Sequence, residues 1–168
     1  IDAAHGKSSF RGQGSSKDDG FKANGLSESD LVLSIADALK IAHSGFSSTR
    51  EDYRFISMDD RISKIKEETS VIISLHIGKN DDKEVNPIKA YIPQDAKVTP
   101  EASKLSCMII NNLLSDPDIT DPHITSTSII QTDPKIMSKK NPLFILSQGS
   151  YGFETATIKS DEKILVVG

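Results

Sequence analysis

Apolar residues recur at helical spacing in two stretches of the chain. In the first stretch they lie four, four and three positions apart, and in the second they mark one side of a helix from Glu101 to Leu114. Both patterns predict a helix with one face buried against a core. The apolar positions are Leu31, Ile35, Leu39 and Ala42 in the first helix, and Ala102, Leu105, Ile109 and Leu113 in the second.

Two serines provide start signals for helices. Ser27 is followed three positions later by Asp30, which resembles a capping box and places Glu28 in the first turn of the first helix. Ser57 and Asp60 repeat the same spacing and predict a further short helix.

An almost unbroken run of apolar, mostly β-branched residues from Val71 to Leu75 is typical of a parallel strand buried on both faces. Shorter apolar runs at 88–92, 143–146 and 164–167 are further strand candidates, and Ile1 to Ala3 form the end of a first strand. Because strands alternate with helices, we predict an α/β fold with a mainly parallel, twisted sheet flanked by helices. A length of 168 residues fits one domain, spanning 1–168.

Two stretches lack such patterns. Lys7 to Asn24 is mostly Ser, Gly, Lys and Asp, so we expect a long, mobile Ser/Gly-rich loop without rigid structure after the first strand. Three Asp-Pro pairs lie between Asp116 and Pro134, where we expect a long irregular segment.

The chain begins with Ile1 rather than Met, which we interpret as a processed product or an excised domain with a clipped first strand.

Composition and charge exclude several classes of protein. Twenty Lys and Arg against 24 Asp and Glu give a net charge of −4, so the chain lacks a basic field for nucleic acid. Its longest aliphatic runs are too short for a transmembrane segment. The single cysteine, Cys107, excludes an intramolecular disulfide framework and a thiolate-rich zinc site.

Candidate chemistry lies where strands end. His5 follows the first strand and His76 follows the run from Val71 to Leu75, so neighbouring parallel strands would bring both imidazoles to one edge of the sheet. Glu28, at the start of the helix that follows the first loop, can place its carboxylate at the same edge. Two imidazoles and a carboxylate are a recurring ligand set for catalytic zinc. The same residues also occur at strand ends and helix starts without a metal, and position alone leaves both interpretations open.

Five segments, in order along the chain, resemble the zinc-dependent N-acetylmuramoyl-L-alanine amidases of type 3, which are cell-wall hydrolases. The similarity extends from Ile1 to about Gly149. The matching segments are IDAAHG at 1–6 (IDAGHG in the family), LSESDLVL at 26–33 (LxEKDVVL), STR at 48–50 (LTR), SMDDR at 57–61 (SLxxR) and SLH at 74–76 (SIH).

The resemblance implies that His5, Glu28 and His76 bind Zn²⁺ and that the reaction is metal-assisted hydrolysis of the amide between N-acetylmuramic acid and L-alanine. It also implies a periplasmic or extracellular location and peptidoglycan or a muropeptide as partner; we expect a monomer. Arg50 and Arg61 match family positions as well, and we interpret each as part of a structural ion pair near the sheet edge rather than as a substrate contact.

One position departs from the family. Its general-base glutamate lies in a PxxLVExG segment, and the matching residues 142–149 place Ser147 at that position. A serine hydroxyl is far too weak a base to hold a proton at neutral pH, and general acid–base catalysis is typically worth about 10²–10⁴ in rate. Glu154, seven residues further on, is a candidate for a substitute base, but the frequency of glutamate at protein surfaces favours a surface residue.

Three interpretations follow. The first is an active zinc amidase that acts on peptidoglycan and needs a replacement base, because Ser147 stands where the general-base glutamate is expected. The second is a catalytically silent member of the same fold that binds muropeptide or a partner protein. The third is an unrelated flavodoxin-like domain without a metal.

Overall fold

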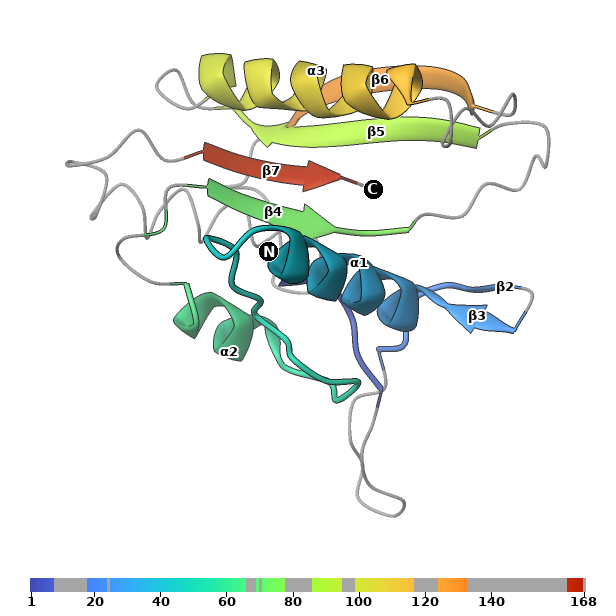
Figure 1. Cartoon of the computed structure of the whole chain (residues 1–168), viewed down its shortest axis with the longest axis vertical. Coiled ribbons are helices and arrows are strands. Elements are labelled where there is room, and N and C mark those ends of the chain that lie inside the picture. The colour runs from blue at the N-terminus through green and yellow to red at the C-terminus, as the bar shows by residue number, and fades with distance from the viewer. Residues whose placement is uncertain are drawn as a thin grey trace.

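The structure is a computed structural model and describes residues 1–7, 18–23, 25–65, 69, 71–77, 86–94, 99–116, 124–132 and 163–167. No helix among them is long and apolar enough to cross a bilayer. The elements, in chain order (Figure 1), are β1 (Asp2–Ala3), β2 (Lys22–Ala23), β3 (Leu26–Ser27), α1 (Glu28–Ala42), α2 (Met58–Ser63), β4 (Val71–Leu75), β5 (Asn86–Pro93), α3 (Thr99–Ser115), β6 (Ile124–Thr132) and β7 (Lys163–Val167).

In the described part of the chain, a five-stranded sheet in the order β1-β4-β7-β5-β6 forms the centre of the fold, and β2 and β3 form a separate antiparallel pair. Strand β1 is parallel to β4, β4 to β7, and β5 to β6. Strand β5 runs antiparallel to β7, so the sheet is mixed. The expected α/β class is confirmed, and the strand candidate at 164–167 is β7; the candidate at 143–146 lies outside the described residues.

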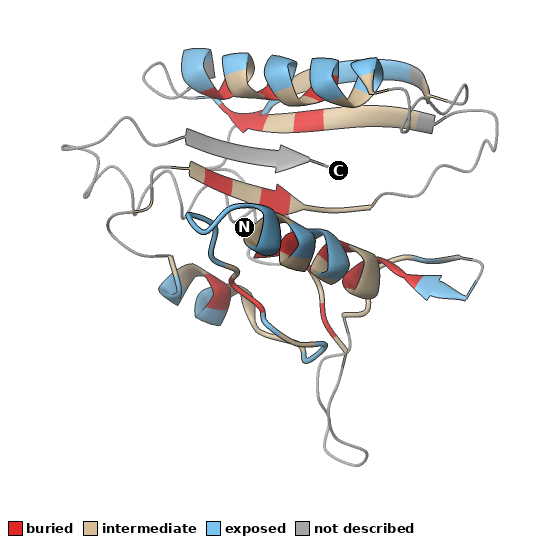
Figure 2. Ribbon diagram, in the orientation of Figure 1, coloured by how far each residue is buried: buried red, intermediate tan, exposed pale blue. Residues whose placement is uncertain are grey.

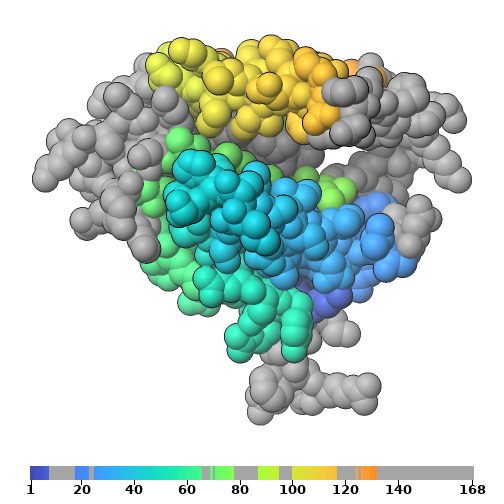
Figure 3. All heavy atoms as spheres, in the orientation of Figure 1, coloured from blue at the N-terminus to red at the C-terminus, as the bar shows by residue number. Residues whose placement is uncertain are grey.

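Helices α1 and α3 cover the same face of the sheet (Figure 1). Leu75 packs against the cluster that joins β1 to α1, and Ile73 packs against the cluster that joins α3 to β5. Alternate residues of a strand point to the same face, so both helices lie on that face. Figure 2 shows their buried sides turned toward the sheet, and Figure 3 shows their outer sides forming much of the described surface in this view.

The opposite face of β1 carries a buried polar network. Asp2 is fully buried and accepts hydrogen bonds from Thr49 Oγ1 at 2.7 Å and from Ser74 Oγ at 2.6 Å. Arg61 of α2 donates from Nη1 to both carboxylate oxygens of Asp2, at 3.0 Å to Oδ2 and 3.3 Å to Oδ1, so α2 is tied to this face. The interpretation of Arg61 as part of a structural ion pair is confirmed, with Asp2 as its partner.

The expectation of an irregular segment from 116 to 134 is wrong for residues 124–132, which form β6. Strand β6 lies at the edge of the sheet, and its exposed positions Ser126, Thr127 and Ser128 are polar. Serine and threonine are typical of turns, but threonine and isoleucine also favour strands. The partner strand β5 decides between these tendencies, and it lies far away in sequence.

The expectation that no regular structure occurs between Lys7 and Asn24 is wrong for residues 18–23. Gly6 and Asp18 form a β-bridge, and the Gly6 amide donates to the Asp18 carbonyl at 2.7 Å. Strand β2 begins four residues later, at Lys22. Residues 8–17 lie outside the described part of the chain.

Candidate metal centre

Three chain segments bring His5, Glu28 and His76 to one edge of the sheet. Ala3 pairs with Leu75 in the parallel register of β1 and β4, so the residues that follow the two strands emerge at the same edge. Glu28 is the first residue of α1, and Ser27 caps this helix by accepting a hydrogen bond from the Asp30 amide, as the spacing predicts. The structure therefore brings all three sequence-predicted ligands together.

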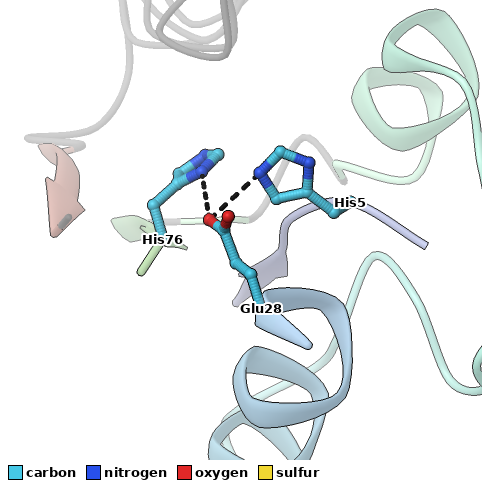
Figure 4. Close-up of side chains that lie close together, drawn as sticks. All are labelled: His5, Glu28 and His76. Carbon is cyan, nitrogen blue, oxygen red and sulfur yellow. Dashed lines mark hydrogen bonds and ion pairs between the residues drawn. The ribbon is translucent and has the colours of Figure 1, made fainter. Parts of the chain in front are cut away.

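The two imidazoles converge on a single carboxylate oxygen (Figure 4). His5 Nε2 lies 3.0 Å and His76 Nδ1 lies 3.1 Å from Glu28 Oε1. The rings are nearly perpendicular, at 87°, with centroids 5.1 Å apart. One ligand atom from each residue lies within 4.8 Å of the others, so the cluster could hold a metal ion.

Glu28 is held on both oxygens by backbone amides. Ile77 N donates to Oε1 at 2.9 Å, and Phe21 N donates to Oε2 at 2.9 Å. Burial alone would raise the pKa of Glu28, but hydrogen bonds from both imidazoles and both amides outweigh it and hold the pKa far below the usual range. The side chain is only 6% exposed and carries a fixed negative charge at the centre of the site.

His5 is oriented from behind by a second carboxylate. Its backbone is in the left-handed region, with φ of 62°, and its Nδ1 lies 2.6 Å from Asp18 Oδ1. Burial by itself would lower the pKa of His5, but the hydrogen bonds to Glu28 and Asp18 exceed that effect and raise the pKa.

A buried arginine ties together the backbone segments that carry two of the three side chains. Arg50 is fully buried and donates from Nε to the Ala3 carbonyl at 3.1 Å. Its Nη2 donates to Ala4 O at 3.1 Å and to Ser29 O at 2.7 Å. Ala4 precedes His5 and Ser29 follows Glu28 in the sequence, so the guanidinium fixes the spacing between these segments. The structural interpretation of Arg50 is supported, but its partners among the described residues are carbonyls and not the carboxylate of an ion pair.

Sequence reasoning did not single out Asp18. It stands beside Asp19 in a stretch of Ser, Gly, Lys and Asp, where no signal in one sequence distinguishes the two carboxylates. Ser147 and Glu154 lie outside the described residues.

The fold and this cluster define an α/β protein with a candidate metal centre at the carboxyl edge of its sheet. The chain belongs to the N-acetylmuramoyl-L-alanine amidase family, whose model matches residues 1–148. Among solved structures, it is similar to the catalytic domain of CwlV, an N-acetylmuramoyl-L-alanine amidase from Bacillus (Paenibacillus) polymyxa var. colistinus. The TM-score is 0.56 and the identity 13%, over 99% of this chain and 75% of that chain. No curated protein sequence matches the chain.

Membership excludes the interpretation as an unrelated flavodoxin-like domain. The family consists of zinc-dependent amidases that act on peptidoglycan, typically at the cell envelope.

The cluster fits zinc in donor type and spacing. Ligand atoms about 2.0 Å from a tetrahedral zinc ion lie about 3.3 Å from one another, close to the 3.0 and 3.1 Å separations from Glu28 Oε1. His76 Nε2 is buried and has no hydrogen-bond partner among the described residues. Zinc bound at His76 Nδ1, the atom that faces Glu28, would not give Nε2 a partner, so the fit rests on the donor types and on the two separations.

Proposed function

We propose that this chain binds zinc through His5, Glu28 and His76 and acts on the amide bond between N-acetylmuramic acid and L-alanine in peptidoglycan. The observation that carries the proposal is the convergence of both imidazoles on Glu28 Oε1, at 3.0 and 3.1 Å, from three distant stretches of a chain of this family. The same membership supports a periplasmic or extracellular location.

In this proposal the three side chains are the ligands that bind the zinc ion. Three protein ligands leave one position of a tetrahedral zinc ion open, and zinc at such a site lowers the pKa of water and polarises a carbonyl. Glu28 supplies the negative charge and is kept ionised by its hydrogen bonds. Because His5, Glu28 and His76 are occupied as ligands, the proton acceptor for amide hydrolysis has to come from another residue.

That proton acceptor decides between two functions. Ser147 stands at the position of the family's glutamate, so we propose an amidase that is slow by about 10²–10⁴ relative to a site with a carboxylate base. Glu154 is the candidate for a substitute base. The second function is a catalytically silent module that binds muropeptide or a partner protein, and the same serine favours it.

Release of dye-labelled fragments from purified cell wall, with and without a chelator, tests the proposal. Weak turnover that the chelator abolishes, and that Ser147→Glu raises by about 10²-fold or more, would support the slow amidase. The control is Ser150→Glu, which adds the same charge three positions away. Loss of turnover in Glu154→Gln would assign the base to Glu154.

The negative outcomes are distinct. No turnover in the wild type together with a gain in Ser147→Glu would support the silent module, whereas strong wild-type turnover that the chelator abolishes would refute it. Zinc absent from the protein as purified, with no thermal shift on adding it, would refute the metal site itself.

A further inference from the structure

Asp18 contacts the candidate metal centre from outside the three ligands. Its Oδ1 lies 2.6 Å from His5 Nδ1, on the opposite side of the ring from Nε2, which faces Glu28 Oε1 at 3.0 Å. The imidazole is thus held at both nitrogens by carboxylates. The His5 side chain is 13% exposed, whereas the Asp18 side chain is 47% exposed.

This arrangement distinguishes the two nitrogens of His5, because Nε2 faces the cluster and Nδ1 faces Asp18. A carboxylate can only accept a hydrogen bond, so the contact with Asp18 requires a proton on Nδ1. Nε2 also faces a carboxylate, Glu28 Oε1, so without a metal it donates as well, and a metal bound in the cluster would take the place of that proton. Asp18 lies outside the cluster, so the proton on Nδ1 would stay when Nε2 binds the metal. A carboxylate that orients a metal-binding histidine in this way also limits rotation of the ring.

The segment that carries Asp18 also supports Glu28. The Glu28 amide donates to Phe21 O at 2.7 Å, the Phe21 amide donates to Glu28 Oε2 at 2.9 Å, and the Ser29 amide donates to Asp19 O at 3.2 Å. Residues 18–21 therefore fix the position of Asp18 relative to both His5 and Glu28. These backbone contacts do not involve the Asp18 carboxylate, so removing that carboxylate leaves them available.

Asp19 is a matched comparison within the same segment. Its carboxylate pairs with Lys22 Nζ at 2.5 Å, and the Lys22 side chain is 60% exposed. Two adjacent residues of one type therefore differ in what their side chains contact: a histidine of the cluster in one case and a surface lysine in the other.

We propose that Asp18 is a positioning residue of the zinc site, which keeps His5 protonated at Nδ1 and its Nε2 directed at the metal. The inference rests on the proposed function, because it assumes that His5 binds zinc. It assigns a role to the end of the Ser/Gly-rich segment, and it predicts that the metal site depends on a side chain that does not bind the metal.

Zinc affinity, measured at neutral pH by competition with a chromogenic chelator, tests the inference without any turnover. Asp18→Ala should weaken zinc binding about 10–100-fold. Asp18→Asn should recover part of that loss, because the carboxamide oxygen still accepts a hydrogen bond from Nδ1. Asp19→Ala should bind zinc as the wild type does.

Cobalt substitution supplies a second readout. The visible absorption of bound Co²⁺ reports the geometry of its ligands, so its band should change in Asp18→Ala and stay the same in Asp19→Ala. Circular dichroism and cooperative thermal unfolding show which variants are folded. If Asp18→Ala is unfolded, Asp18→Asn carries the test, with an affinity below that of the wild type as the expected result.

The failures are separable. If the wild type binds zinc and the Asp18 variants bind it equally well with the same cobalt spectrum, the role of Asp18 is refuted while the proposed function stands. If Asp19→Ala loses as much affinity as Asp18→Ala, the effect belongs to the loop as a whole, and the inference is overturned. If the wild type binds no zinc, the proposed function itself fails.

Discussion

Replacing Arg50 with methionine should destabilise the protein more than replacing any exposed arginine. Methionine keeps an unbranched apolar chain in the space but removes the guanidinium, which donates to the carbonyls of Ala3, Ala4, Ser29 and Asp52 at 2.7 to 3.1 Å. The first three of these hydrogen bonds are buried, and removing the donor leaves their acceptors without it.

The magnitude follows from two opposing effects. A buried acceptor left unsatisfied costs about 1–3 kcal/mol, so three of them cost about 3–9 kcal/mol. Removing a fully buried guanidinium also removes its desolvation penalty, which is several kcal/mol and offsets part of that cost. We expect a net loss of about 3–4 kcal/mol, a large part of the 5–15 kcal/mol typical of a folded domain.

Urea unfolding in the presence of a chelator measures this loss directly. Arg54→Met is the matched control, because Arg54 is exposed and pairs with Asp52 at the surface, and its unfolding midpoint should stay close to that of the wild type. Arg50→Lys should be intermediate, since one ammonium cannot span the same set of carbonyls. A loss below about 1 kcal/mol in Arg50→Met would refute the reasoning from buried carbonyls.

Three further predictions concern the site. Gly20→Ala should weaken zinc binding, whereas Gly25→Ala should not. Both glycines have positive φ, of 67° and 78°, but a Cβ at Gly20 would lie 2.5 Å from Glu28 Oε2, and a Cβ at Gly25 would have nothing within 4 Å. Equal zinc affinities of the two variants in a chelator competition would contradict this. Zinc at about 100 times its Kd should stabilise the fold by about 2.7 kcal/mol, and a chelator should reverse the shift in a thermal melt; an equal shift in His76→Ala would count against the site. In a chelator, stability should fall as the pH rises above about 6.5, the ordinary pKa of histidine, because the raised pKa of His5 gives a stabilising contribution that is complete below that pH and is lost as the pH passes the folded pKa. The lowered pKa of Glu28 gives a contribution that is lost only in acid. Thermal melts of the wild type and Glu28→Gln check this, and the same slope in both would contradict it.

Local signals in the sequence were sufficient to place the elements that carry the candidate ligands, but the predicted buried face of α1 is wrong, because Val32 and Ala36 are buried while Ile35 and Ala42 are exposed. The Ser27 and Asp30 spacing predicted the start of α1 at Glu28, and the run from Val71 to Leu75 coincides with β4. Capping involves neighbouring residues, and a buried strand needs a continuous apolar run, so both can be recognised within a few positions. The meeting of His5 and His76 followed from one further rule, that parallel strands end at the same edge of a sheet.

Only the tertiary structure decided which partners the remaining groups have. Strand β6 needs β5 beside it, Asp18 needs the His5 ring, and Arg50 needs carbonyls that lie 21 to 47 residues away in sequence. No pattern within a short window distinguishes Asp18 from Asp19, because both are acidic residues in the same polar stretch. The residue types along the chain determine what chemistry is available, whereas the contacts that orient those residues exist only once distant segments have packed together.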